Sequence, residues 1–338
     1  MSLPDWARAH GPSLFAAIIR SVPEDFEVTE ELGWQLTGDG EHDYLWVEKT
    51  GANTEWVARQ LARFAAVPVK DVGFAGLKDR HAVTRQWFSV PRWNAPAWQA
   101  LEVEGAEVLD VQRHHRKLKR GVHRANRFRI VLRGELPPSA AVADRIAGIE
   151  TAGVPNYFGE QRFGRAGGNL QLTDDWAAGR RLPRHKRSIA ISTARSYLFN
   201  EQLDARVREG TWNRIVAGDV VNLDGSGSVF QADDVDDELE RRAAAMDVHP
   251  AGGLWGDGRT SSATASNHTD WRSALVSARV KTAHRSLRLR IDELEWSIAD
   301  ESLTLAFRLG RGAFATAVLR EIAQYDDGRL RSPALSGN

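Results

Sequence analysis

The chain has 338 residues, a formal net charge of zero and no cysteine. This length allows two domains with substantial cores, and 42% hydrophobic with 27% charged residues is typical of a soluble globular protein. The lack of cysteine excludes disulfides, thiolate metal ligands and cysteine nucleophiles. No apolar run approaches the ~18 residues that span a bilayer, and the N-terminus resembles no secretory leader, so we expect a cytoplasmic protein without a membrane partner.

The first 152 residues mix strand and helix signals. Residues 127–133 alternate, with Phe128 and Ile130 on the apolar face and three arginines on the other, which predicts a half-buried strand with a basic outer face. The predicted elements of this part are strands at 44–49, 86–90 and 127–133, a helix at 54–64, and a helix that starts at Pro137-Pro138-Ser139 and ends at about 152.

Gly153-Val154-Pro155 marks a predicted boundary, after which the coarse class remains α+β. Residues 252–268 are rich in Gly, Ser and Thr and predict a loop, and the tail from Asp326 is expected to be disordered. The other predicted elements are helices at 194–207, 236–245, 270–281 and 315–323, and strands at 286–291, 294–298 and 303–309.

Charge is strongly segregated along the chain. Residues 113–133 hold nine Arg or Lys, three His and no acid, whereas residues 233–240 hold six acids and no base. The basic segment suits a nucleic-acid backbone, because each neutralised phosphate releases counterions. The alternative is a solvated strand with an adjoining basic loop. Phe128 fits either a core position or a platform on which a base stacks.

Residues 74–88, FAGLKDRHAVTRQWF, surround one acid, Asp79, with Lys78, Arg80 and Arg85. Taken alone, this could be a solvated turn or the floor of an active site. The chain has no phosphate-binding P-loop, no H-E-x-x-H zinc motif and no strand-G-x-G-x-x-G-helix unit. His114 and His115 are adjacent, which is poor geometry for two ligands of one metal. We therefore expect no metal and no cofactor.

Six sequence blocks then resemble one family. GLKDRHAVTRQ, residues 76–86, resembles the G-x-K-D-x-x-A-x-T-x-Q signature of the TruD family of tRNA pseudouridine synthases. The other similar blocks, in the family's order, are DFEVTE (25–30), KRGVHRANRF (119–128), NYFGEQRFG (156–164), RSYLFN (195–200) and GAFATAVLRE (312–321).

The resemblance implies an α+β architecture in two domains. One is a pseudouridine synthase catalytic domain, with a mixed, mainly antiparallel sheet in permuted strand order, over residues 1–152 and 295–338. The other is an inserted family-specific α/β TRUD domain over residues 153–294.

The resemblance also implies the residues of the site. Asp79 would be the catalytic carboxylate, and Phe26, Asn126 and Phe314 would bind the target uridine. An opposite charge from Lys78, Arg80 or Arg85 would favour the charged form of Asp79, and which atom the carboxylate attacks, or whether a glycal forms, is left open. Expected RNA-backbone contacts are Lys78, Arg80, Lys117, Lys119, Arg120, Arg127, Arg129 and Arg162.

The implied function is cofactor-independent isomerisation of uridine to pseudouridine in tRNA, at position 13 of the D-stem, with tRNA as partner and no obligate protein partner. Two rivals remain open. A non-catalytic RNA-binding or RNA-folding module would use the same basic segment, and a glycosidase acting on nucleic acid would release uracil.

Overall fold

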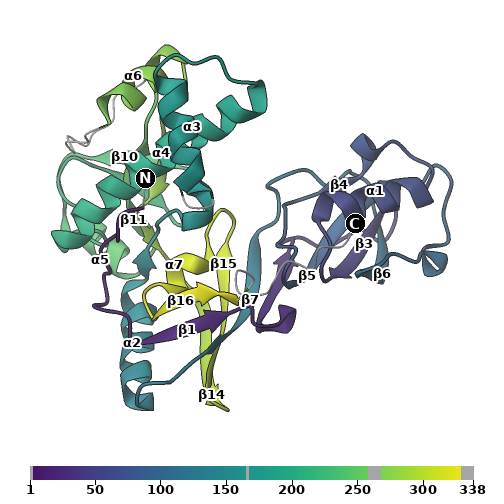
Figure 1. The fold of residues 1–338 in the computed structure, drawn as a ribbon, viewed down its shortest axis with the longest axis horizontal. Coiled ribbons are helices and arrows are strands. Elements are labelled where there is room, and N and C mark those ends of the chain that lie inside the picture. The colour runs from purple at the N-terminus through teal and green to yellow at the C-terminus, as the bar shows by residue number, and fades with distance from the viewer. Residues whose placement is uncertain (1–2, 165–166, 258–267, 329–338) are drawn as a thin grey trace. The chain divides into compact units, whose positions relative to one another are not determined.

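A computed structural model describes residues 3–164, 167–257 and 268–328. The chain forms two compact units (Figure 1). Among the described residues, the large-sheet unit comprises residues 14–141, 292–312 and 323–328, and the helix-rich unit comprises residues 3–13, 142–164, 167–257, 268–291 and 313–322. Most of the strands belong to the large-sheet unit, and most of the α-helices belong to the helix-rich unit.

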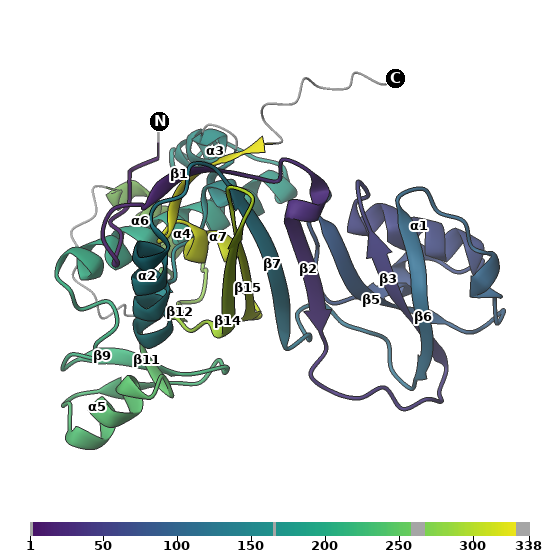
Figure 2. The same cartoon turned by 90° about the horizontal axis from the view of Figure 1, so that it is seen from below.

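The large-sheet unit is built on one mixed sheet (Figure 2). Its strands run in the order β14-β15-β7-β2-β5-β3-β6, β1 pairs with β7 and β16, and β4 pairs with β5. The pairs β1–β16 and β2–β5 are parallel and the other pairs are antiparallel. The strands are β1 Phe15–Ile19, β2 Phe26–Glu31, β3 His42–Lys49, β4 Gly73–Phe74, β5 Val83–Pro91, β6 Ala106–His114, β7 Ala125–Arg133, β14 Asp292–Ala299, β15 Ser302–Gly310 and β16 Ala323–Asp327.

The helix α1, Thr54–Phe64, covers part of this sheet. Its apolar residues recur every three or four positions, so that Val57, Ala58 and Leu61 lie on one stripe, and this stripe is buried against β3 and β5. Short 3-10 helices lie at η1 Pro23–Asp25, η2 Val69–Asp71 and η3 Trp98–Ala100. The buried stripe leaves the opposite, charged face of α1 at the surface.

The helix-rich unit packs helices around a four-stranded sheet, in the order β10-β9-β11-β12, and a small β8–β13 pair. Its main core lies between α4, α3, α6 and the neighbouring strands. The elements are α2 Ser139–Ala152 (its first residues belong to the large-sheet unit), α3 Gly168–Ala177, α4 Arg184–Arg208, α5 Asp237–Ala244, α6 Thr269–Ser277, α7 Ala315–Leu319, η4 Glu160–Phe163, β8 Val154–Pro155, β9 Asp219–Leu223, β10 Val229–Ala232, β11 Val248–Leu254, β12 Ala283–Ser286 and β13 Arg288–Leu289.

Most predicted elements are confirmed, and four are corrected. The helix predicted at 315–323 ends at Leu319, and Ala323 already belongs to β16. The single strand predicted at 286–291 is wrong: β12 ends at Ser286, and buried Leu287 interrupts it before β13 pairs with β8. The tail is ordered through Asp327, because β16 pairs in parallel with β1. The predicted loop at 252–268 begins later, since Gly252 lies in β11, where a Cβ would come 2.9 Å from Phe199. Residues 258–267 of that loop lie outside the described residues.

The mixed α+β sheet architecture is confirmed. The grouping into compact units differs from the predicted domain bounds in placing residues 3–13, 142–152 and 313–322 with the helix-rich unit and residues 292–294 with the large-sheet unit. The bounds 1–152 with 295–338, and 153–294, stay a prediction about domain organisation. No helix within residues 3–164, 167–257 and 268–328 is long and apolar enough to cross a membrane.

Candidate active site

Asp79 lies in the loop between β4 and β5, with its side chain partly exposed. Its Oδ2 forms an ion pair with Arg20 Nη2 at 3.2 Å, and its Oδ1 accepts a hydrogen bond from the backbone N–H of His81 at 3.0 Å. The second contact is an Asx-type turn, in which the aspartate orders its own loop. Both carboxylate oxygens are therefore oriented, while 19% of the side chain remains exposed to solvent.

Arg20 connects this loop to the ends of two distant strands. It follows β1 directly, and Ile19 pairs with Asp327 at the end of the parallel strand β16. Arg20 Nη1 lies 3.1 Å from Asp327 Oδ2, and its guanidinium lies 3.8 Å from the centre of the Phe26 ring. Its φ of 56° is in the left-handed region, which is costly for a residue with a side chain. The surrounding contacts hold this conformation, and the side chain lies between two carboxylates.

A buried lysine holds the backbone of the same loop. Lys49 is 1% exposed, and its Nζ donates to the Asp79 carbonyl at 2.9 Å and to the Lys78 carbonyl at 3.5 Å. Burial lowers the pKa of Lys49 from 10.5 to about 8, and the nearby charge of Asp79 opposes this effect by raising the pKa. A second anchor is Thr54, whose hydroxyl accepts from the Lys78 N–H at 3.0 Å.

The three cations expected around Asp79 have other partners. Lys78 Nζ forms a buried ion pair with Glu30 at 2.6 Å, and Arg80 Nε donates to the Gly51 carbonyl at 2.8 Å. Arg85 pairs with two glutamates, Glu27 at 3.2 Å and Glu48 at 2.7 Å. The cation seated on the Asp79 carboxylate is Arg20, which sequence reasoning missed. Its only local signal was its position directly after an apolar strand.

Asn126 belongs to a polar cluster beside the Lys78–Glu30 pair. Asn126 lies opposite Glu30 in the β2–β7 register, and its side-chain nitrogen lies 3.3 Å from His123 Nε2. Burial and the nearby charge of Lys78 lower the pKa of His123, which favours its neutral form. His123 Nδ1 and Asn126 Oδ1 are buried without a hydrogen-bond partner among the described residues. Such unpaired groups are uncommon and mark a place where a ligand could bind.

Two predicted aromatic residues lie in different surroundings. Phe26 is 4% exposed, with its edge toward Phe128 and its face under Arg20, so it supports the arginine from below. Phe128 itself is 8% exposed and stacks on Phe307 at 5.5 Å, so the core alternative for Phe128 is the correct one.

Phe314 lies in the helix-rich unit, half-buried beside Phe158 at 6.0 Å. Two arginines flank these rings: Arg285 is 4.4 Å from the Phe158 ring centre, and Arg162 is 5.5 Å from it. Burial, followed by the charge of Arg162, lowers the pKa of Arg285 to about 10. Asn156 of the NYFGEQRFG block orients Arg285 by accepting hydrogen bonds from it. This cluster of cations and rings suits a phosphate or a base.

The basic strand β7 is largely neutralised by its neighbours. Glu27 lies opposite Arg129 in the register and pairs with it at 3.2 Å. Arg127 pairs with Glu31 at 3.3 Å and with Glu293 at 2.5 Å. The outer face of this part of the sheet is thus a ladder of alternating charges, each exposed pair contributing about 0–1 kcal/mol. The loop half of the basic segment, with Lys117, Lys119 and Arg120, lines a groove described below.

No group of three or more His, Asp or Glu side chains that could hold a metal ion occurs in residues 3–164, 167–257 and 268–328.

The fold matches that of a known protein. The structure superposes on the crystal structure of a protein from Methanosarcina mazei, described as a TruD-type tRNA pseudouridine synthase, with a TM-score of 0.73, 20% identity and coverage of 96% of this chain and 97% of that one. The family model for tRNA pseudouridine synthase D (TruD) matches residues 13–173 and 168–322.

Curated relatives agree with the structural match and with the family model. The tRNA pseudouridine synthase D of Methylococcus capsulatus is 46% identical over 95% of each chain, and that of Nitrosococcus oceani is 45% identical over 93% of this chain and 92% of that one. The chain therefore belongs to the TruD family of tRNA pseudouridine synthases, which are isomerases.

Proposed function

We propose that this chain isomerises uridine to pseudouridine in tRNA, at position 13 of the D-stem, with Asp79 as the nucleophile and without a cofactor. The observation that carries the assignment of Asp79 is its position in the family motif, oriented by Arg20 and by the His81 N–H. The D-stem position follows from the family resemblance.

The reaction balances within the substrate. The N1–C1′ bond breaks with its electron pair remaining on uracil, the base turns, and C5 forms the new bond to C1′. The C5 proton is then lost and N1 is protonated. Nothing is oxidised or reduced and no external group is transferred, so the balance requires no cofactor. The carboxylate must be charged to act as a nucleophile, whichever atom it attacks.

The surroundings of Asp79 support this role. Arg20 at 3.2 Å stabilises the charged carboxylate, and Lys49 fixes the backbone that carries it. The target uridine must leave its stack to reach such a loop. We assign Asn126, through its unpaired carbonyl oxygen, and Phe314, through its half-exposed ring, to binding of the uracil. The Phe26 ring lies beneath Arg20 and supports its guanidinium.

Among the proposed RNA contacts, the structure favours those that are not already neutralised. Arg162 lies next to Arg285 and Phe314 and would contact a phosphate of the RNA. Arg127 and Arg129 are half-exposed but paired with acids, and Lys78 is buried against Glu30. We expect these three to contribute less to RNA binding than Lys117 and Lys119, which form no ion pair in the described part of the chain, and than Arg120, whose ion pair with Glu55 is exposed and 3.6 Å long.

The test replaces Asp79 by asparagine, which keeps the shape and removes the charge. We expect Asp79→Asn to form no pseudouridine in tRNA from a deletion strain, read by carbodiimide and primer extension, while its affinity for tRNA stays within about threefold. Asp327→Asn is the matched control, because it removes the other carboxylate partner of Arg20 and leaves Asp79 intact.

Conversion by Asp79→Asn at the wild-type rate would show that the assignment is wrong. An unchanged modification profile with the wild-type chain would favour the RNA-binding or RNA-folding module, and uracil released into solution would favour the glycosidase.

A further inference from the structure

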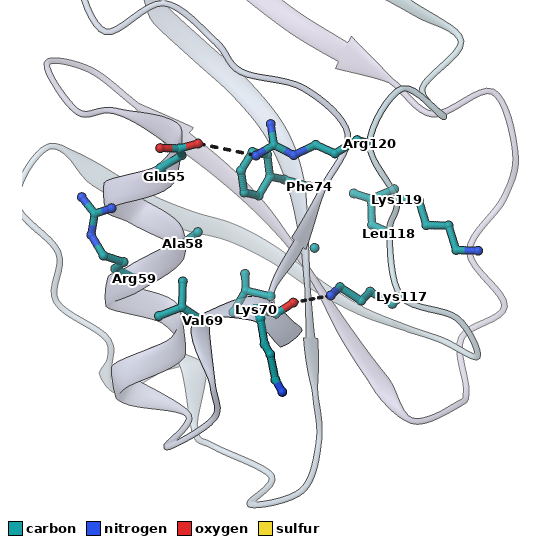
Figure 3. A pocket seen from close by; sticks show the side chains of 12 residues that line it. Glu55, Ala58, Arg59, Val69, Lys70, Phe74, Lys117, Leu118, Lys119 and Arg120 are labelled. Atoms are coloured by element: carbon teal, nitrogen blue, oxygen red, sulfur yellow. Dashed lines mark hydrogen bonds and ion pairs between the residues drawn. The ribbon is translucent and has the colours of Figure 1, made fainter. Parts of the chain in front are cut away.

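A second positively charged feature lies on the large-sheet unit, where α1 faces the loop before β7. Here a groove of about 580 Å³ is bordered by Glu55 and Arg59 of α1, by Lys70 of η2, and by the loop residues Lys117, Lys119 and Arg120. Figure 3 shows Glu55 and Arg59 projecting from the helix on one side and Lys119 and Arg120 on the other. We call this feature the basic groove. Its volume lies within the ~300–1,000 Å³ usual for ligand sites.

The charge of the basic groove is unbalanced. Five cationic side chains line it against one carboxylate, Glu55, which lies 3.6 Å from Arg120. In the described part of the chain, Arg59, Lys70, Lys117 and Lys119 form no ion pair. This contrasts with β7, where Arg127 and Arg129 pair with glutamates of β2 and Arg133 pairs with Asp25 of η1. A concentration of unpaired cations in a hollow attracts polyanions.

The cations stand on a rigid base. Leu118, between Lys117 and Lys119, is 2% exposed, and its N–H donates to Ser89 Oγ at 2.8 Å. A Cβ on Gly73 would lie 2.2 Å from the Leu118 carbonyl oxygen, so β4 and this loop touch directly. The guanidinium carbon of Arg120 lies over the Phe74 ring, 3.7 Å from its centre, and 56% of the Arg120 side chain is exposed, so it can also contact a base.

The basic groove is also bonded to the loop that carries Asp79. The Gly121 N–H, directly after Arg120, donates to the Ala75 carbonyl at 2.7 Å. On the other side, Thr54, directly before Glu55, accepts from the Lys78 N–H. Hence both walls of the groove are hydrogen-bonded to the segment 75–78.

From these four observations we propose that the basic groove binds the phosphodiester backbone of the substrate RNA, as a site separate from the nucleotide that reacts at Asp79. This rests on the proposed function for the identity of the RNA. Among possible polyanions, RNA is favoured because an arginine stacked on an aromatic ring offers a face for a base as well as a charge for phosphate.

The experiment compares two single variants, Arg59→Ala and Lys119→Ala, and their double variant with wild type. Arg241→Ala is the control, since Arg241 is an exposed helix arginine on α5, outside the groove. Binding of unmodified tRNA is measured by filter binding from low to high salt. Because these side chains are exposed, circular dichroism and thermal melting should match wild type.

We expect the double variant to bind tRNA at least tenfold more weakly, and each substitution to reduce the slope of log K against log salt by about 0.7–0.9. The KM for tRNA in pseudouridine formation should rise in parallel with this loss of affinity. Wild-type affinity and slope in the double variant, or an equal loss in Arg241→Ala, would overturn the proposal.

The two proposals fail in different ways. If the wild-type chain modifies no uridine but the groove variants still lose tRNA affinity with the predicted slope, the isomerase assignment fails and the groove stands. If the wild-type chain modifies tRNA and the groove variants bind like wild type, the groove proposal fails and the assignment stands.

Discussion

Lys49 provides a quantitative test of how the Asp79 loop is held. Its pKa of about 8 in the folded chain compares with 10.5 when solvated, because burial disfavours the charged ammonium. The difference of about 2.5 units corresponds to about 3 kcal/mol at 1.36 kcal/mol per unit. Lys49 is 1% exposed, so solvent screening does not reduce this value substantially. Below pH 8 the buried, charged ammonium therefore destabilises the folded chain by about this free energy.

The sign of the pH dependence follows from proton counting. Below pH 8 Lys49 is protonated in both the folded and unfolded chains, so its contribution is constant. Between pH 8 and 10.5 the unfolded chain retains the proton that the folded chain has lost, so the free energy of unfolding rises with pH. Above 10.5 both are neutral, and the gain is complete.

The assay is urea unfolding of wild type and Lys49→Met from pH 7 to 11. The difference between their free energies of unfolding should be flat up to about pH 8 and then shift by about 3 kcal/mol in favour of wild type. Subtraction removes the titration of all shared groups. Lys49→Arg, which keeps its charge across this range, should give the same curve against wild type. A difference that stays flat to pH 11 would refute the reasoning.

Two further predictions concern packing beside the site. Lys78→Met should destabilise the chain by about 3–5 kcal/mol, because it leaves the Glu30 carboxylate buried without its cation, and adding Glu30→Gln should restore much of the loss. Chemical denaturation of the single and double variants measures these free energies of unfolding, and a double variant whose loss equals the sum of the two single losses would contradict the prediction. Gly73→Ala should lower the free energy of unfolding by about 1–3 kcal/mol, since the added Cβ would collide with the Leu118 carbonyl, whereas the Cβ of Gly168→Ala meets open space. Equal melting temperatures of the two variants would contradict this prediction.

Local patterns predicted much of the fold. The stripe of Val57 and Leu61 and the alternation of 127–133 correspond to α1 and β7, because periodicity depends only on near neighbours in the chain. The strand β16 was missed because its polar sequence owes its order to parallel pairing with β1, at the opposite end of the chain. For the same reason the pairing of Arg20 with Asp79 could not be predicted.

By itself, the sequence determined the family, the presence of a single carboxylate in the block that resembles the family signature, and a basic segment without acids. Only the tertiary structure decided which cations are available. The order of the strands places Glu27 and Glu31 of β2 against the arginines of β7, which neutralises the strand half of the segment. The loop half meets α1 instead and keeps its charge. The strand order decides which charged residues become neighbours, and for this reason Asp79 pairs with Arg20, directly after β1.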